Sequence, residues 1–279
     1  MRLIAALLTL VGVTVGTAVS AVTDPTPEPI EIVGGENALR GILYRPEGAG
    51  PFPGVVGLHG CGGLNDGAGT LATRYRDWGE RLAKAGFAVL LPDSYGSRGL
   101  GSQCFTRARV VRTDRERVAD ANAARHWLQK QPWIKPEHVS LLGWSNGGIA
   151  TLWAVRPRAA VHDGGPDFRS AVALYPGCRR LGETAWSARV PTLILIGRAD
   201  DWASAAACER MVAGARGRSA GTSLVIYPGA YHDFDHPNRP VHVRHGYAFS
   251  VDGSGKVHTG TNLAARDDAL KRVPQWLAR

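Results

Sequence analysis

The sequence predicts an α/β protein with a mostly parallel sheet covered by helices on both faces. Short apolar runs of strand length alternate along the chain with amphipathic segments of helix length, and glycine or proline separates them. Most of these runs are apolar throughout, as expected of strands buried on both faces. The chain has 279 residues, of which 44% are hydrophobic and 20% charged, which is ordinary for a globular protein with a sizeable core.

The predicted strands are apolar stretches bounded by turn residues: Leu39–Arg45, Gly54–His59, Phe87–Leu91, Val139–Gly143, Ser170–Tyr175, Thr192–Ile196 and Ser223–Tyr227. The predicted helices have apolar residues at helical spacing or a start signal: Leu71–Ala85, Thr113–Gln129, Asn146–Val155, Ala203–Val212 and Leu263–Leu277. In the second helix we expect Thr113 as N-cap and Glu116 as its capping-box partner. In such sheets the reacting groups lie beyond the carboxyl ends of the strands.

The N-terminus is expected to be a signal peptide, residues 1–21, followed by one domain over residues 22–279. Arg2 supplies a positive charge, Leu3–Val19 is apolar, and small residues precede cleavage after Ser20 or Ala21. An uncleaved membrane anchor is the alternative. No cysteine at the boundary offers a lipid site, so we expect no stable membrane anchor. The protein is therefore predicted to be exported, periplasmic or secreted.

The net charge is +9, mostly from arginine. The densest arginine run also contains acidic residues, so we interpret it as a solvated helix face with internal ion pairs. The alternative is that Arg98, Arg107 or Arg109 attracts an anionic substrate. Aromatic residues do not interleave with the basic ones, and we expect no nucleic-acid partner. Oligomeric state cannot be predicted from this sequence.

Gly143-Trp144-Ser145-Asn146-Gly147 is a G-x-S-x-G motif between a predicted strand and a predicted helix. This is the setting of a nucleophile elbow, in which a strained turn exposes the serine and the flanking glycines avoid clashes. We therefore predict Ser145 as a nucleophile.

Two later loops supply partners for this serine. Asp200 follows the strand that ends at Ile196, and His232 follows the last predicted strand. The carboxylate would orient the imidazole, which would serve as base. Asp201 is the alternative acid, and it is otherwise expected to cap the helix near Ala203. The order Ser, Asp, His is that of the α/β-hydrolase fold.

Leu58-His59-Gly60-Cys61-Gly62-Gly63 follows the first buried strand, at the position of an oxyanion-hole loop. The backbone N–H groups of Cys61 and Asn146 are the predicted oxyanion donors, and His59 is interpreted as a structural hydrogen-bonding residue. Candidates for the substrate pocket are aromatic residues beside these motifs: Trp144, Tyr95, Trp202 and Phe234.

With these motifs the chain resembles the dienelactone hydrolase family. The matching stretches span nearly the whole mature chain: Leu58–Leu64, Leu91–Gly99, Leu142–Gly148, Tyr175–Cys178, Ile196–Trp202 and Tyr227–Phe234. The resemblance implies an α/β-hydrolase fold and hydrolysis of a small-molecule ester or lactone without a cofactor. It places nucleophile, acid and base on Ser145, Asp200 and His232. The family's name-giving enzymes use cysteine as nucleophile where this chain has serine, which favours a general esterase.

Four cysteines in an oxidising compartment allow three pairings. We favour Cys61–Cys104 and Cys178–Cys208, because the members of each pair follow neighbouring strands at the carboxyl edge of the sheet. A free Cys61 is the alternative.

Three rival functions remain open. A metal-dependent hydrolase would use His232 and His236 with His242 or His245, although H-E-x-x-H is missing and Pro237 breaks the stretch, so we predict no metal. A peptidase of the prolyl-oligopeptidase type shares the order of the triad. A binding protein on a catalytically dead hydrolase fold is the third.

Overall fold

A computed structural model describes residues 24–33, 38–159 and 164–279. The predicted signal peptide, residues 1–21, lies outside the described residues. In the part that is described, no helix combines the length and the apolar character needed to cross a membrane.

Eight strands form one sheet in the order β1-β2-β4-β3-β5-β6-β7-β8. They are β1 Pro27–Ile32, β2 Leu39–Tyr44, β3 Phe52–Leu58, β4 Ala88–Pro92, β5 Ile134–Trp144, β6 Ala171–Leu174, β7 Thr192–Gly197 and β8 Thr222–Tyr227. The six strands from β4 to β8 across the sheet are parallel, and β1 and β2 are antiparallel at one edge. The predicted fold class is confirmed.

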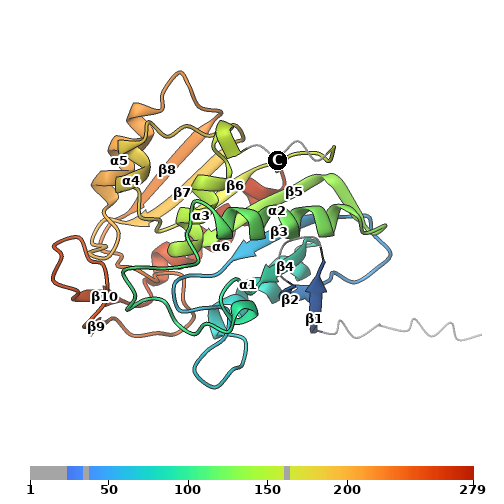
Figure 1. Cartoon of the computed structure of the whole chain (residues 1–279), viewed down its shortest axis with the longest axis horizontal. Coiled ribbons are helices and arrows are strands. Elements are labelled where there is room, and N and C mark those ends of the chain that lie inside the picture. Colours follow the sequence, from blue (N-terminus) through green and yellow to red (C-terminus); the bar gives the residue numbers. More distant parts are fainter. Residues whose placement is uncertain (1–23, 34–37, 160–163) are drawn as a thin grey trace, which may run out of the picture.

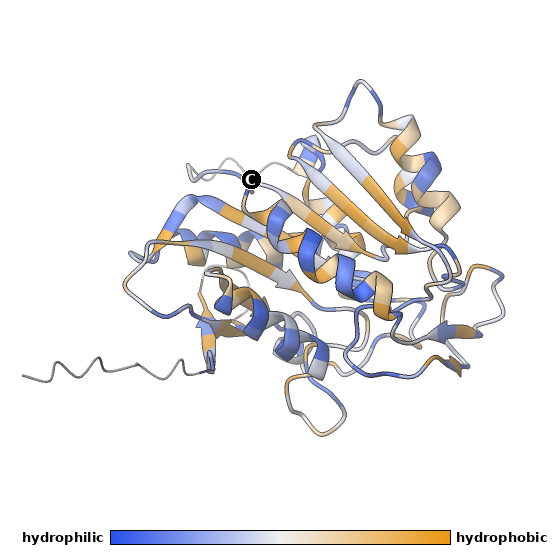
Figure 2. Cartoon of the chain, turned by 180° about the vertical axis from the view of Figure 1, so that it is seen from behind, coloured by the Kyte–Doolittle hydropathy of each residue, from blue (hydrophilic) through white to orange (hydrophobic). Residues whose placement is uncertain are grey.

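Helices cover both faces of this sheet (Figure 1). The α-helices are α1 Thr73–Lys84, α2 Glu116–Gln129, α3 Asn146–Ala154, α4 Arg179–Glu183, α5 Ala205–Gly214 and α6 Leu263–Leu277, and η1 Gly96–Arg98 and η2 Pro157–Ala159 are short 3-10 turns. Helices α2 and α3 pack side by side on one face, and α1 and α6 lie on the other, seen from behind in Figure 2. An ion pair between Asp77 and Arg266 joins α1 to α6 at 2.7 Å.

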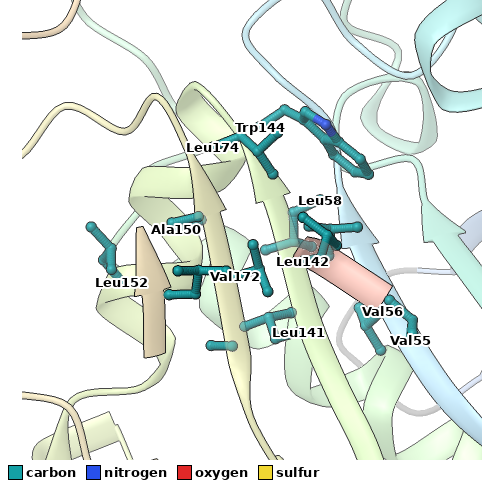
Figure 3. Packing of buried hydrophobic residues seen from close by; sticks show 14 of the residues in the cluster. Val55, Val56, Leu58, Leu141, Leu142, Trp144, Ala150, Leu152, Val172 and Leu174 are labelled. Atoms are coloured by element: carbon teal, nitrogen blue, oxygen red, sulfur yellow. The ribbon is translucent and has the colours of Figure 1, made fainter. Parts of the chain in front are cut away.

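The core lies between the central strands and these helices. Figure 3 labels Val55 and Leu58 of β3, Leu142 of β5, and Ala150 and Leu152 of α3 among the side chains of this core, and all five are fully buried. Burying a side chain of this kind stabilises the fold by about 1.5–3 kcal/mol. The packed strands thereby fix the loops that follow their carboxyl ends.

Several features differ from the sequence prediction, among them the helix α4, which was not expected. The strand β1 was missed, and so was the two-stranded sheet of β9 His242–Arg244 and β10 Val257–Thr259. The capping box was wrong, because α2 begins at Glu116, whose carboxylate accepts from the backbone N–H of Arg112 at 2.8 Å.

Candidate active site

Ser145 lies on a sharp turn between β5 and α3, with φ 53° and ψ −113°. A side chain at either flanking glycine would meet backbone. A Cβ at Gly147 would lie 1.9 Å from the carbonyl oxygen of Leu58, and one at Gly143 would lie 2.3 Å from that of Gly147. The turn therefore requires glycine at both positions, and it presents the serine at the carboxyl edge of the sheet.

A chain of hydrogen bonds joins the three residues expected to form the triad. His232 Nε2 lies 2.8 Å from Ser145 Oγ, and His232 Nδ1 lies 2.7 Å from Asp200 Oδ2. The other carboxylate oxygen, Oδ1, accepts from the backbone N–H groups of Trp202 at 2.9 Å and Ala203 at 2.8 Å. The carboxylate is thus held at both oxygens, and it fixes the orientation of the imidazole.

Burial alone would lower the pKa of His232, which is almost completely buried. The negative charge and the hydrogen bond of Asp200, with the charge of Asp233 behind it, outweigh burial and raise the pKa above its usual value. The imidazole is therefore a stronger base than a free one, and Asp200 is positioned to stabilise the imidazolium.

Asp201 points away from this chain of hydrogen bonds. Its carboxylate lies 2.6 Å from Nδ1 of His258 and accepts from the backbone N–H of the same residue at 2.8 Å. It does not cap the next helix either, because α5 is capped by Ser204. Of the two neighbouring carboxylates, Asp200 alone contacts His232.

The loop expected to form the oxyanion hole is held from several sides. His59 bonds through Nδ1 to the carbonyl of Gly60 at 2.8 Å, and Tyr75 Oη accepts from the N–H of Gly60 at 2.8 Å. Cys61 is bonded to Cys104, and its carbonyl accepts from Gln103 N at 2.8 Å. Burial, followed by the charge of Arg117, holds the pKa of His59 well below its usual range, which keeps this histidine neutral.

The structure contains both of the expected disulfides. Cys61 is joined to Cys104 and Cys178 to Cys208, and no free cysteine is found in the described ranges. The first bond ties the loop after β3 to the long loop after β4. The second ties the loop after β6 to α5, and both Cys61 and Cys178 line the cleft at Ser145.

The serine opens onto a cleft with two lobes. One cavity has a volume of about 520 Å³ and the other about 420 Å³. Four residues line both of them: Cys61, Ser145, Trp202 and His232. The first cavity also includes Asn146, so the two expected oxyanion donors lie at its wall with the serine.

Of the four aromatic residues expected in the pocket, only Trp202 lines the cleft. Trp144, Tyr95 and Phe234 are fully buried, which corrects the prediction. Trp144 immediately precedes Ser145, so its side chain points into the protein, where its Nε1 donates to Asp235 at 3.0 Å. Phe234 packs against Tyr175 in the core.

The larger cavity is basic. Five arginines line it, against two acidic residues: Arg107, Arg109, Arg112, Arg179 and Arg180, with Asp114 and Glu183. The positions of Arg107 and Arg109 therefore fit the alternative that an arginine of this run attracts an anionic substrate. This alternative does not fit Arg98, which forms a two-fold hydrogen bond to Asp120 at 2.7 and 2.9 Å and does not line the cleft.

A buried charged cluster supports the loop that carries His232. Asp235 is fully buried and accepts from Trp78 at 2.7 Å, Trp144 at 3.0 Å and Tyr175 at 2.7 Å. Asp233 pairs with Arg74 at 2.7 Å. Burial would raise the pKa of Asp233, but the guanidinium outweighs it and lowers the pKa to about 2. The sequence analysis missed this cluster, although the acidic residues on either side of Phe234 were its signal.

The histidines of the rival metal site are spread apart. His232 belongs to the hydrogen-bonded triad, and His242 contacts the carbonyl of Pro240 at 2.9 Å. Over residues 24–33, 38–159 and 164–279, no group of three or more potential metal ligands comes together.

Residues 237–260, whose purpose the sequence did not reveal, contact His232 and support its loop. Strand β10 forms a bridge from Thr259 to His232, and the N–H of Gly260 donates to the carbonyl of His232 at 3.0 Å. Figure 1 shows β9 and β10 beyond the end of the main sheet. The connection between them contributes Phe249 and Val251 to the wall of the larger cavity.

A model of the dienelactone hydrolase family matches residues 39–279. The chain belongs to this family. The resemblance noted from the sequence is thereby confirmed, and so is the expectation of a hydrolase of the α/β-hydrolase fold.

Three of its relatives share about a quarter of the aligned residues with this chain. An uncharacterized peptidase of Bacillus subtilis is 24% identical over 77% of this chain, and this chain spans only 36% of its length. A probable 2-oxo-3-(5-oxofuran-2-ylidene)propanoate lactonase of Bradyrhizobium is 25% identical over 72% of this chain and 80% of its own length. The crystal structure of a dienelactone hydrolase from Anabaena variabilis, 22% identical, has a TM-score of 0.61 and covers 92% of this chain and 98% of its own. At that identity the likeness to the crystal structure supports the fold alone.

Proposed function

We propose that the protein is a serine hydrolase that cleaves small carboxylic esters or lactones through an acyl-enzyme. The observation that carries the proposal is the hydrogen-bond chain from Ser145 through His232 to Asp200, opening onto a cleft of two lobes. A triad alone would fit other acyl transfers, and family membership favours esters and lactones.

In the first step Ser145 Oγ attacks the carbonyl carbon while His232 Nε2 takes the hydroxyl proton. The N–H groups of Cys61 and Asn146 stabilise the oxyanion, each by about 3 kcal/mol. The imidazolium then protonates the leaving alcohol, and the C–O bond breaks to leave an acyl-serine. Water, activated by His232, repeats the sequence and releases the acid.

Two lobes that meet at the serine suit a substrate with a group on each side of the scissile bond. We assign no cofactor to the reaction, because each proton transfer has a residue in position. Two disulfides and the apolar N-terminal segment support a site of action outside the cytoplasm, where disulfides persist.

The test is labelling with a fluorophosphonate, followed by mass spectrometry of the intact protein and of its peptides. We expect one adduct, on Ser145, that is lost in Ser145→Ala and His232→Ala together with hydrolysis of p-nitrophenyl acetate. Ser223→Ala, an exposed serine on β8, is the matched control and should behave as wild type. A folded wild-type protein that takes no label would contradict the proposal and favour a binding protein.

A further inference from the structure

Arg117 of α2 is a fully buried arginine without an acidic partner. Its side chain is 0% exposed. In the described part of the chain it forms no ion pair with an aspartate or glutamate, and its Nε and one terminal nitrogen have no hydrogen-bond partner. Burying an unpaired charge is costly, and buried arginines are normally paired, so a role for this charge must be sought nearby.

In the described part of the chain the one side-chain hydrogen bond of Arg117 leads to the nucleophile elbow. Its remaining terminal nitrogen donates to Asn146 Oδ1 at 2.7 Å, and the same oxygen accepts from Tyr95 Oη at 3.0 Å. The guanidinium also lies over the ring of Tyr95, 5.3 Å from its centre. Arg117 is therefore in direct contact with the residue that follows Ser145.

Two neutral groups, Tyr95 and His59, lie beside Arg117 behind the elbow, and the carboxylate of Asp93 lies beyond His59, 3.9 Å from its Nε2. Tyr95 is fully buried, and its ring meets His59 edge-on at 4.7 Å. Nε2 of His59 accepts from the N–H of Ser94 at 3.2 Å, as a neutral imidazole does. In the described residues Arg117 thus has no carboxylate at ion-pair distance, and the neutral Tyr95 and Asn146 are its direct contacts.

Asn146 connects this charge to the reaction. It is the first residue of α3, so its N–H has no acceptor within the helix, and in the proposed mechanism it donates to the oxyanion. An oxyanion held there would be joined to the guanidinium through Asn146, whose side-chain oxygen accepts from Arg117. The negative oxyanion would then interact with the positive Arg117 only while the tetrahedral intermediate exists. An interaction made only at that stage lowers the barrier of the reaction.

We propose that Arg117 is a positioning residue that holds Asn146 and places a positive charge behind the oxyanion hole. The inference rests on the proposed serine-hydrolase function. It assigns a catalytic purpose to a residue that neither lines the cleft nor touches substrate.

The experiment compares Arg117→Met and Arg117→Lys by the second-order rate of fluorophosphonate labelling and by kcat and KM for p-nitrophenyl acetate. Loss of one oxyanion donor costs about 10²–10³ in rate, and a charge acting through one residue should cost less, about 10- to 100-fold. We expect this loss in Arg117→Met, in the labelling rate and in kcat, with KM changed by less than about twofold. Arg117→Lys should recover most of the rate.

Arg125→Met is the matched control. Arg125 lies on the same helix, is 1% exposed and packs over Phe168, away from the elbow. Arg125→Met should leave the labelling rate unchanged. A wild-type labelling rate in folded Arg117→Met, or equal losses in the Lys and Met variants, would overturn the inference while leaving the triad in place.

Asn146→Ala provides a second test, which can be used even if Arg117→Met does not fold. It keeps the backbone N–H and removes the oxygen that Arg117 contacts, so labelling should slow about tenfold. A wild-type rate would show that Arg117 does not act through Asn146. Failure of the wild-type protein to label at Ser145 is a different result, which would contradict the proposed function itself.

Discussion

Replacing Asp200 with asparagine tests the triad most directly. Asp200 uses both oxygens as acceptors, Oδ2 for the imidazole and Oδ1 for two backbone N–H groups. An asparagine brings an NH₂ group that cannot accept. With its oxygen kept toward the backbone, the NH₂ group would face His232 Nδ1 and move the imidazole proton to Nε2, where it blocks proton transfer from Ser145.

The magnitude follows from charge and tautomer together. Two unit charges about 4 Å apart interact by about 4 kcal/mol at an effective dielectric constant of about 20. Losing that stabilisation of the imidazolium corresponds to about a thousandfold in rate. The wrong tautomer adds to this, so we expect kcat to fall by about 10⁴, the loss typical of this substitution in Ser-His-Asp enzymes.

The assay is steady-state hydrolysis of p-nitrophenyl acetate, with thermal unfolding as the check on folding. Asp201→Asn is the control, because Asp201 bonds to His258 and not to His232. It should lower kcat by less than about tenfold, as expected for a half-exposed pair. Equal losses in the two variants, or a larger loss in Asp201→Asn, would refute the assignment of Asp200 as the acid.

Two further predictions concern the base and the elbow. Because the pKa of His232 is raised, kcat/KM should fall as the pH decreases through the pKa of His232, which is higher than that of a free imidazole. A pH–rate profile that falls only below the pKa of a free imidazole would contradict this prediction. Gly147→Ala should destabilise the protein by about 3 kcal/mol or prevent folding, since its Cβ would lie 1.9 Å from a backbone oxygen. Gly62→Ala, with nothing within 4 Å of its Cβ, should change the urea midpoint little; similar midpoints for the two variants would show that the elbow is not tightly packed.

Much of the site could be predicted because its parts are local in sequence. A strand, a turn and a reactive residue follow one another at Ser145, Asp200 and His232, and a parallel sheet brings such turns to one edge. The two disulfides follow from the same topology. The positions of the central strands and their burial could likewise be predicted, because each strand is a short apolar run in the sequence.

The remaining features depend on contacts between distant segments. Strand β1 begins at Pro27 and contains Pro29, which argues against a central strand but is tolerated at the edge, where β1 pairs only with β2. Strands β9 and β10 have three residues each, too few for a period to be visible. Arg117 belongs to a run of charges typical of a solvated face, and only the fold shows that it is buried.

The β9–β10 segment also determines when the active site is completed. The chain is synthesised from the N-terminus, so the elbow, the oxyanion loop and Asp200 emerge before the residues that hold His232 from the other side, Thr259 and Gly260. A nascent or nicked chain that lacks this pairing would keep Ser145 on its turn but would leave His232 without this support. Completion of the site is therefore coupled to the docking of a segment that is made after all the strands of the central sheet.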